Sequence, residues 1–298
     1  MKVLAFGEIL WDVFPQEKHL GGASLNFAAH LARHGHEVYP VSALGPDSYG
    51  EEALQLLDQW ALKKDLVATV PDKQTGKCLV TLDAAGMPKY DLLQDVAYDY
   101  IPATVENSEY DVLYFGTLAM RQNYNRESLK ALLKNNRFTH IFADINIRPP
   151  FQFPETTAFA AENATILKVS EEELGEVARL LAMEEAEPKA FAKALADRYS
   201  NLQYIIITLG GEGAIALDCK AGKEYTCPSE KVTVVSTVGA GDSFSAAFTH
   251  RLMAGEPLES CLSYASRVAG FVVSQQGAVP EYDPKDFAEE IPPSFDGG

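Results

Sequence analysis

The chain has 298 residues, of which 47% are hydrophobic and 10% aromatic, so it can bury a large core and wholesale disorder is excluded. Its formal net charge of −17 argues against nucleic acid or an anionic membrane surface as the main partner, because both attract basic proteins. Four scattered cysteines without CxxC spacing favour reduced thiols in the cytoplasm over a disulfide framework or a zinc site. The first 14 residues are typical of a β-strand and not of a signal peptide, and no apolar run reaches the roughly 20 residues that span a bilayer.

Short apolar runs alternate with amphipathic helical segments, which predicts an α/β fold with a parallel sheet covered on both faces. Strands are expected at residues 2–7, 37–43, 111–116, 140–145, 165–169, 204–209, 213–218, 224–227 and 232–235. Helices are expected at residues 49–60, at 129–133 behind Asn125 as N-cap, and at 243–254 and 258–274.

Two insertions, near residues 13–20 and 75–100, interrupt this alternation. Residues 77–82 and 88–93 predict a β-hairpin with a turn at 83–86, and residues 14–20 form a second irregular piece after the first strand. Together they predict a small β-lid over the carboxyl ends of the strands, where open α/β sheets bind ligands. Because the sequence shows no linker and no internal repeat, we expect one domain over residues 1–298 with the lid as an insertion.

The strongest chemical signal is Gly239-Ala240-Gly241-Asp242, which lies between a β-rich run and an amphipathic helix. Small residues at a helix N-terminus leave backbone N–H groups free and let an anion approach them. An Asp in the first helical turn is then placed to accept a proton from a hydroxyl that attacks a phosphoryl group. Taken alone, the motif is equally well explained as a glycine turn with an Asp that complements the helix dipole.

Two earlier motifs are suited to a polyhydroxy ligand. Gly21-Gly22 opens the first helix, and Asn26 within it offers both a donor and an acceptor to sugar hydroxyls. Asp12, after the first strand, could grip a vicinal diol. An ordinary glycine turn and a loop carboxylate are the simpler explanations of each motif by itself.

Three further segments concern nucleotide, metal and phosphate. The turn from Thr208 to Gly213 suits a nucleotide laid across backbone, and it fits neither the GxGxxG nor the Walker A pattern. Glu173 could join a magnesium shell, although Ser170 and Glu173 have the spacing of a capping box, which is the favoured interpretation. The alternating Asp144, Asn146 and Arg148 could point toward the ligand crevice or could be exposed loop residues.

The order of these motifs resembles the PfkB (ribokinase-like) carbohydrate kinase family over residues 2–280. Residues 7–12, residues 116–119 with Arg121, and residues 144–148 are most similar to fructokinases. The resemblance implies a Rossmann-like three-layer sandwich with a β-lid, and the lid of this family often forms a dimer interface.

The resemblance also implies roles for individual residues. Asp242 matches the catalytic base, and the anion hole is matched by Gly239, Ala240 and Gly241. The positions that match substrate-binding residues are Asp12, Gly22, Asn26 and Arg148. The positions that match the nucleotide site are Thr208, Gly210, Gly213 and Gly277, and the implied cofactors are ATP and Mg²⁺, with Glu173 near the metal.

Two positions depart from the family pattern. Ser236 stands where the family usually has the Asp that helps hold a monovalent cation, which weakens the case for K⁺ activation. Ser170 replaces the Asn of the N-x-x-E motif, which weakens the inferred magnesium geometry around Glu173. Neither departure touches Asp242.

The favoured function is ATP-dependent phosphorylation of a sugar hydroxyl, with fructose first among the substrates. Ribose, 2-keto-3-deoxygluconate and nucleosides stay open, because lid residues decide the choice; Trp11 and Tyr98 are candidates to flank the sugar, and packing is favoured for Tyr98. A catalytically silent sugar sensor on the same fold is the main alternative. A dinucleotide-dependent oxidoreductase is disfavoured, because the first strand–helix turn lacks the glycine fingerprint.

Overall fold

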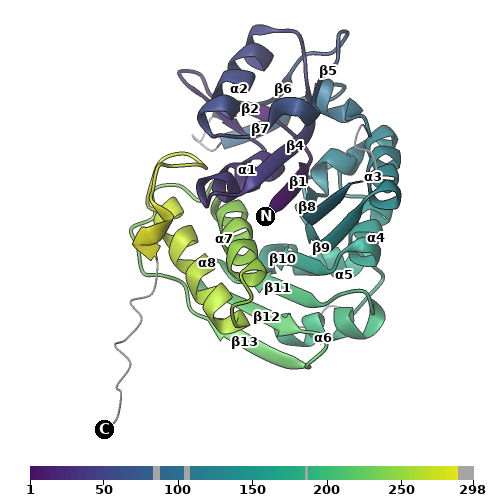
Figure 1. Ribbon diagram of the computed structural model, residues 1–298, viewed down its shortest axis with the longest axis vertical. Helices are drawn as coiled ribbons and strands as arrows, with labels where there is room; N and C mark the ends of the chain where they lie inside the picture. The colour runs from purple at the N-terminus through teal and green to yellow at the C-terminus, as the bar shows by residue number, and fades with distance from the viewer. Residues whose placement is uncertain (83–87, 104–107, 185–186, 288–298) are drawn as a thin grey trace.

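A nine-stranded sheet forms the centre of the computed structural model, which describes residues 1–82, 88–103, 108–184 and 187–287 (Figure 1). Its strand order is β13-β12-β11-β10-β9-β8-β1-β4-β5. All neighbours from β5 to β11 pair in parallel, whereas β12 and β13 are antiparallel. The strands are β1 (Lys2–Phe6), β4 (Glu37–Leu44), β5 (Val67–Thr69), β8 (Glu109–Gly116), β9 (Arg137–Asp144), β10 (Ile166–Ser170), β11 (Tyr204–Thr208), β12 (Ala214–Asp218) and β13 (Lys223–Cys227).

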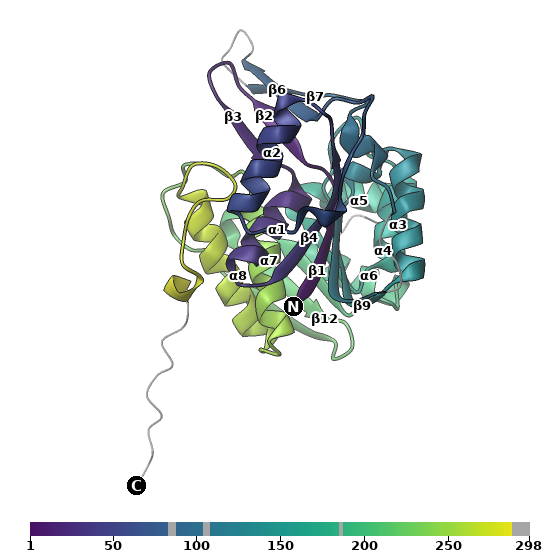
Figure 2. The same cartoon turned by 45° about the horizontal axis from the view of Figure 1, so that its top comes forward.

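Helices cover both faces of this sheet, which confirms the predicted three-layer α/β sandwich (Figure 2). Along β1, Leu4 and Phe6 pack with one helical layer while Val3 and Ala5 pack with the other, as the two-residue period of a strand requires. The first layer contains α3 (Asn123–Asn135), α4 (Pro154–Asn163), α5 (Leu174–Leu180) and α6 (Pro188–Arg198). The second layer contains α1 (Ala23–Arg33), α2 (Ser48–Gln59), α7 (Ala240–Met253) and α8 (Leu258–Val273).

A second, four-stranded sheet fits the predicted lid. Its order is β3-β2-β6-β7, with β2 and β6 parallel and both outer pairs antiparallel. The strands are β2 (Leu10–Val13), β3 (Lys18–Gly21), β6 (Gly76–Leu82) and β7 (Pro88–Leu92). The turn predicted at 83–86 lies outside the described residues. The two insertions therefore build one small sheet, at the top of Figure 2.

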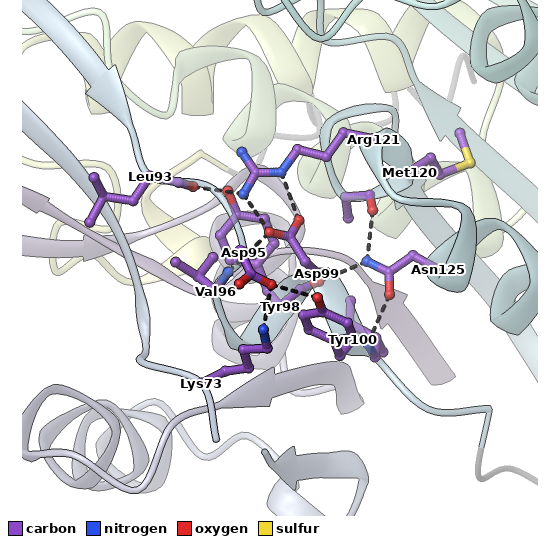
Figure 3. A network of polar contacts seen from close by, with 12 residues as sticks. Lys73, Leu93, Asp95, Val96, Tyr98, Asp99, Tyr100, Met120, Arg121 and Asn125 are labelled. Carbon is purple, nitrogen blue, oxygen red and sulfur yellow. Dashed lines mark hydrogen bonds and ion pairs between the residues drawn. The ribbon is translucent and has the colours of Figure 1, made fainter. Parts of the chain in front are cut away.

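A buried polar network ties the chain that leaves the lid to the main body (Figure 3). Arg121 donates from Nε and Nη2 to the carboxylate of Asp99 at 2.7 and 2.8 Å, and from Nη2 to the Leu93 carbonyl at 2.7 Å. Asn125 accepts from the backbone N–H of Ile101 and donates to the Tyr98 carbonyl. The prediction of Asn125 as an N-cap is therefore wrong: α3 begins two residues earlier, and Asn125 is buried where it satisfies backbone groups of the 97–101 segment.

The last third of the chain corrects two other expectations. The predicted strand at 232–235 is absent, and Val234 and Val235 are 61% and 55% exposed. The backbone N–H of Val235 instead donates to the carbonyl of Val273, at the end of α8. Helix α7 begins at Ala240 and not at 243, because Gly239 precedes it in a left-handed conformation.

Short 3₁₀ helices complete the fold: η1 (Lys64–Leu66), η2 (Ala97–Tyr100), η3 (Leu118–Arg121), η4 (Glu171–Glu173), η5 (Gly210–Glu212) and η6 (Pro284–Phe287). Within the described part of the chain, no helix has both the length and the apolar character needed to cross a membrane.

Candidate active site

Asp242 and Asn26 meet at the N-terminal ends of α7 and α1, which lie side by side (Figure 1). The Nδ2 of Asn26 donates to Oδ2 of Asp242 at 2.8 Å, across a separation of 216 residues. A Cβ atom placed on Gly21 would lie 3.5 Å from Oδ2 of Asp12 and 3.9 Å from Oδ1 of Asn26. The structure therefore brings the predicted base together with Asn26 and Asp12, two of the residues predicted around the sugar.

Two glycines hold the backbone close at this site. Gly22 has φ +119°, and a Cβ there would lie 2.3 Å from the Glu8 carbonyl oxygen. Gly239 has φ +79°, and a Cβ there would lie 2.7 Å from atoms of Ala278. Any side chain would be strained at both positions, so each turn requires glycine. Both turns lead directly into a helix whose first N–H groups lack intrahelical partners.

Burial raises the pKa of Asp242 to about 7. The hydrogen bond from Asn26 acts in the opposite direction, while the nearby charge of Asp144 raises the pKa further. A carboxylate that titrates near neutrality suits general acid–base catalysis, because it can take up a proton and release it again at working pH. Asp242 is also partly exposed, so a ligand can reach it.

A buried ion pair between Lys168 and Asp144 lies behind the Gly239–Gly241 turn. The Nζ of Lys168 contacts both carboxylate oxygens at 2.8 and 3.0 Å, and a Cβ on Gly241 would lie 3.2 Å from that Nζ. Burial alone would lower the pKa of Lys168, but the contacts with Asp144 raise it, so the ammonium stays charged. Because Lys168 is paired with Asp144, its ammonium is not a free positive charge, but it lies beside Gly241 at the turn.

The sequence did not predict the ion pair of Lys168 and Asp144. The pair also corrects the expectation that Asp144 could point toward the ligand crevice. Asp144 is only 3% exposed and faces Lys168, so it does not point into an open ligand crevice. A lysine in the middle of the apolar strand β10 was the signal that could have revealed it. Asn146 is half-buried and its backbone N–H donates to Thr117 Oγ1, while Arg148 is exposed.

The sugar-side residues have buried polar atoms without protein partners. Glu8 is 2% exposed; its Oε1 accepts from the Ala23 N–H at 2.8 Å, while its Oε2 has no partner. The Oδ1 of Asn26 also has none. Burial raises the pKa of both Glu8 and Asp12, and the nearby charge of Arg148 counteracts this at each. Buried acceptors of this kind are normally satisfied, so they suggest a polar ligand.

The two aromatic candidates near the lid are packing residues. Trp11 is 2% exposed and donates from Nε1 to the Tyr49 carbonyl at 3.0 Å. Tyr98 is fully buried, beneath the guanidinium of Arg121. The packing role favoured for Tyr98 is confirmed, although its hydroxyl and the Nη1 of Arg121 have no hydrogen-bond partner.

The predicted nucleotide residues lie on two turns. Thr208 ends β11 and Gly210 is exposed just after it, whereas Gly213 is buried against Cys227. Gly277 lies in the irregular segment after α8. The 228–238 segment joins the two regions: Ser229 Oγ donates to the Gly211 carbonyl near one end, and the other end bonds to the last turn of α8.

Glu173 forms the predicted capping box with Ser170. Its Oε2 accepts from the backbone N–H and the Oγ of Ser170 at 3.2 and 2.7 Å, and its Oε1 accepts from the Ile147 N–H at 2.7 Å. Among the described residues, no group of three His, Cys, Asp or Glu side chains could hold a metal ion. Glu173 therefore faces no preformed metal site in this part of the chain.

Known proteins resemble this chain along nearly its whole length. Residues 3–285 match the pfkB family carbohydrate kinase description. A ribokinase of Bacillus subtilis is 28% identical over 272 residues, which cover 91% of this chain and 87% of the relative. An aminoimidazole riboside kinase of Salmonella typhimurium is 24% identical over 93% of this chain and 91% of its own length.

Solved structures share the fold. Aminoimidazole riboside kinase from Salmonella enterica, in complex with aminoimidazole riboside and an ATP analogue, superposes with a TM-score of 0.81 at 23% identity, covering 96% of this chain and 99% of that one. Fructokinase from Vibrio cholerae with fructose, ADP and calcium gives 0.78 at 20% identity, covering 93% and 94%. With a matching family over nearly the whole sequence, a lidded α/β sandwich and an acid beside an amide-rich turn, this chain belongs to the pfkB family of carbohydrate kinases, phosphotransferases that use ATP to phosphorylate an alcohol group.

Proposed function

We propose that this protein phosphorylates a hydroxyl of a small neutral sugar, fructose first, with Asp242 as the catalytic base. The observation that carries the proposal is the 2.8 Å contact between Asn26 and Asp242, at a point where two glycine-initiated helices converge. It supports an arrangement in which a sugar held at one helix meets a phosphate held at the other.

On the sugar side, Asp12 and Asn26 bind hydroxyls, Gly22 allows close approach to the backbone, and Arg148 closes the exposed side. The reactive hydroxyl gives its proton to the Asp242 carboxylate as its oxygen bonds to the γ-phosphorus, and ADP leaves with the electron pair of the broken P–O bond. The raised pKa of Asp242 makes it a stronger base than an ordinary carboxylate.

On the nucleotide side, the turn of Gly239, Ala240 and Gly241 receives the transferring phosphoryl group through its free amides, while the Ala240 N–H also donates to the Thr237 carbonyl at 3.3 Å. The ammonium of the Lys168–Asp144 pair lies behind Gly241. ATP extends from there along the turn from Thr208 to Gly213, with Gly277 near the base.

When bound with the nucleotide, Mg²⁺ would offset part of the phosphate charge. Glu173 is the carboxylate we propose for its outer shell, because both carboxylate oxygens already accept hydrogen bonds from protein groups. Ser236 lacks the carboxylate that would favour a monovalent cation, so we propose that activity does not require K⁺.

The charges around the pocket favour a neutral sugar over a sugar acid. Arg121 is neutralised by Asp99, and Arg148 lies within electrostatic reach of Asp12 and Glu8. The unpaired oxygens of Glu8 and Asn26 are suited to hydroxyl groups. We therefore rank fructose as the best expected substrate, ahead of 2-keto-3-deoxygluconate. Ribose, which the name of one relative implies as its substrate, ranks second.

The lid is also proposed as a homodimer contact. Its outer strand β7 carries Tyr90, which is 62% exposed. An exposed edge strand with an aromatic side chain is a suitable pairing surface. Light scattering should give twice the chain mass, and the Tyr90→Lys protein should shift toward monomer; a wild-type monomer at all concentrations contradicts the proposal.

A coupled assay for ADP, run with fructose, ribose, 2-keto-3-deoxygluconate and aminoimidazole riboside, tests the function. We expect sugar-dependent ADP release, highest with fructose, that is lost in Asp242→Asn. Release that is equal with and without every sugar contradicts the proposal. Sugar binding by calorimetry without any ADP release supports the silent sensor instead.

A further inference from the structure

The chain after α8 forms a loop at one side of the molecule, yellow in Figures 1 and 2, and its residues contact α1. We call residues 278–282 the C-terminal strap. The guanidinium of Arg33 on α1 pairs with Glu281 at 2.6 Å and donates to the Tyr282 carbonyl at 3.3 Å. The strap has no regular secondary structure, so side chains of α1 contribute much of what holds it.

His30 connects α1 to both ends of the strap from a fully buried position. Its Nε2 lies 2.9 Å from the carbonyl oxygen of Ala278, and its Nδ1 lies 2.7 Å from the hydroxyl of Tyr282. A carbonyl can only accept, so Nε2 carries the hydrogen and Nδ1 accepts from Tyr282. Burial lowers the pKa of His30 to about 3, so the ring stays neutral and keeps this single tautomer.

Ala278 in turn touches the phosphate-binding turn. A Cβ placed on Gly239 would lie 2.7 Å from three atoms of Ala278, and one of these is the carbonyl oxygen that His30 holds. Backbone packs against backbone here, so a shift of Ala278 moves Gly239 as well. Gly239 begins the turn whose amides precede Asp242.

The same helix also holds Asp242 directly. Asn26 and His30 are four residues apart, so they lie on one face of α1, one turn from each other. Asn26 contacts Asp242, while His30 reaches the turn before it through Ala278. One rigid helix therefore orients both the carboxylate and the amides.

We propose that His30 is a positioning residue for nucleotide binding, which fixes the Gly239–Gly241 amides by holding the Ala278 carbonyl. This inference rests on the proposed function in that the turn must bind phosphate. Loss of the His30 hydrogen bond then weakens nucleotide binding and leaves sugar binding intact, because Asn26 and Asp12 are untouched.

His34 provides a matched control for a merely structural histidine. It lies one turn further along α1, its Nδ1 donates to the His30 carbonyl, and its Nε2 lies 2.9 Å from the Tyr264 hydroxyl on α8. Burial lowers the pKa of His34 to about 4, so it is also neutral. It makes no hydrogen bond to the strap.

The test compares His30→Leu, His30→Gln and His34→Leu by calorimetry with a non-hydrolysable ATP analogue and, separately, with fructose. We expect His30→Leu to weaken binding of the analogue about tenfold, because one buried carbonyl loses its donor. Fructose binding should not change. His30→Gln restores binding, because its amide can donate to Ala278 and accept from Tyr282. His34→Leu leaves nucleotide binding unchanged.

Equal loss of nucleotide binding in His30→Leu and His34→Leu, or no loss in either, overturns the inference. If His30→Leu does not fold, the comparison of His30→Gln with Tyr282→Phe decides: a selective nucleotide defect in Tyr282→Phe supports the inference, and wild-type binding in Tyr282→Phe contradicts it. Because binding is measured without turnover, an inactive wild-type protein that binds the analogue refutes the proposed function alone.

Discussion

Asp144 and Asp242 are two acids of one site with opposite surroundings. Asp144 receives both contacts of the Lys168 ammonium, a hydrogen bond from the Tyr114 hydroxyl at 3.2 Å and another from Ser245 Oγ at 3.0 Å. From the residues that the structure describes, Asp242 receives one side-chain hydrogen bond, that of Asn26, and it is partly exposed. One carboxylate is fully paired inside the protein, and the other keeps acceptor capacity for a ligand.

The difference separates a carboxylate that protein groups hold from one that we propose reacts with a ligand. A buried carboxylate that contacts a cation and several donors holds its neighbours in place. A desolvated carboxylate with a single donor has a raised pKa, so proton exchange at neutral pH becomes possible. A substitution at Asp242 should therefore reduce activity, whereas a substitution in the Lys168–Asp144 pair should reduce stability.

Asp242→Asn should give the largest effect on activity. Without the base, turnover should fall by about 10²–10⁴-fold, while fructose binding stays near the wild-type value. The fold should become more stable at pH 8, because the raised pKa means that the ionised Asp242 destabilises the native state. Steady-state kinetics and thermal melts check both effects, and turnover near the wild-type value would remove Asp242 from its role.

Lys168→Met should give the largest effect on stability. It leaves Asp144 buried without its cation, which should lower the free energy of unfolding by about 3–5 kcal/mol. Urea denaturation measures this, and the double variant Lys168→Met with Asp144→Asn should recover much of the loss. The pair of the exposed Lys193 with the half-buried Glu224 is the control, since Lys193→Met should change little. If the double variant were no more stable than the single variant, this account of the pair would be contradicted.

The pH profile should show the titration of Asp242. Because the carboxylate form accepts the proton, kcat/KM for the sugar should fall about tenfold per pH unit below about 7 and level off above it. The stability linkage has the opposite sign: the fold favours protonated Asp242, so this contribution is present at low pH and is lost as pH rises through about 7. The stability gain of Asp242→Asn should thus be larger at pH 8 than at pH 5. A flat kinetic profile down to pH 5 would place the functional pKa elsewhere.

Asn26→Ala should give the smallest effect of the four. The Asn26 hydrogen bond lowers the pKa of Asp242, so its loss should move the acid limb to higher pH. At pH 7 we expect kcat/KM to drop about threefold to tenfold, with partial recovery at higher pH. The measurement is the same profile on the variant. A uniform loss without movement of the limb would show that Asn26 acts on the sugar alone.

The layers, the lid and Asp242 were predictable because their signals are local. Short, nearly continuous apolar runs mark β1 and β4, and small residues before an amphipathic stretch mark the start of α7. The resemblance to known kinases then gave these pieces their order. The roles assigned to the site residues, that of Asp242 included, stay predictions.

The remaining features depend on contacts between distant segments. Lys168 pairs with Asp144 from the neighbouring strand, and no local pattern identifies that partner. Asn125 is of a residue type that is common at N-caps, yet its side chain forms hydrogen bonds with backbone groups of another segment. Residues 232–235 have strong β propensity, but a strand forms only where a partner edge is free, and here the chain bonds to the end of α8.

The 216-residue separation between Asn26 and Asp242 has a consequence for biosynthesis. At about 5–20 residues per second, a ribosome needs roughly 10–40 s to pass from one to the other, and the strap emerges later still. During that interval α7 is not yet available to cover the apolar face of α1, which is exposed to chaperones and to neighbouring nascent chains. A released fragment that ends before Asp242 would lack the proposed base, so we expect no phosphoryl transfer until translation has passed residue 242.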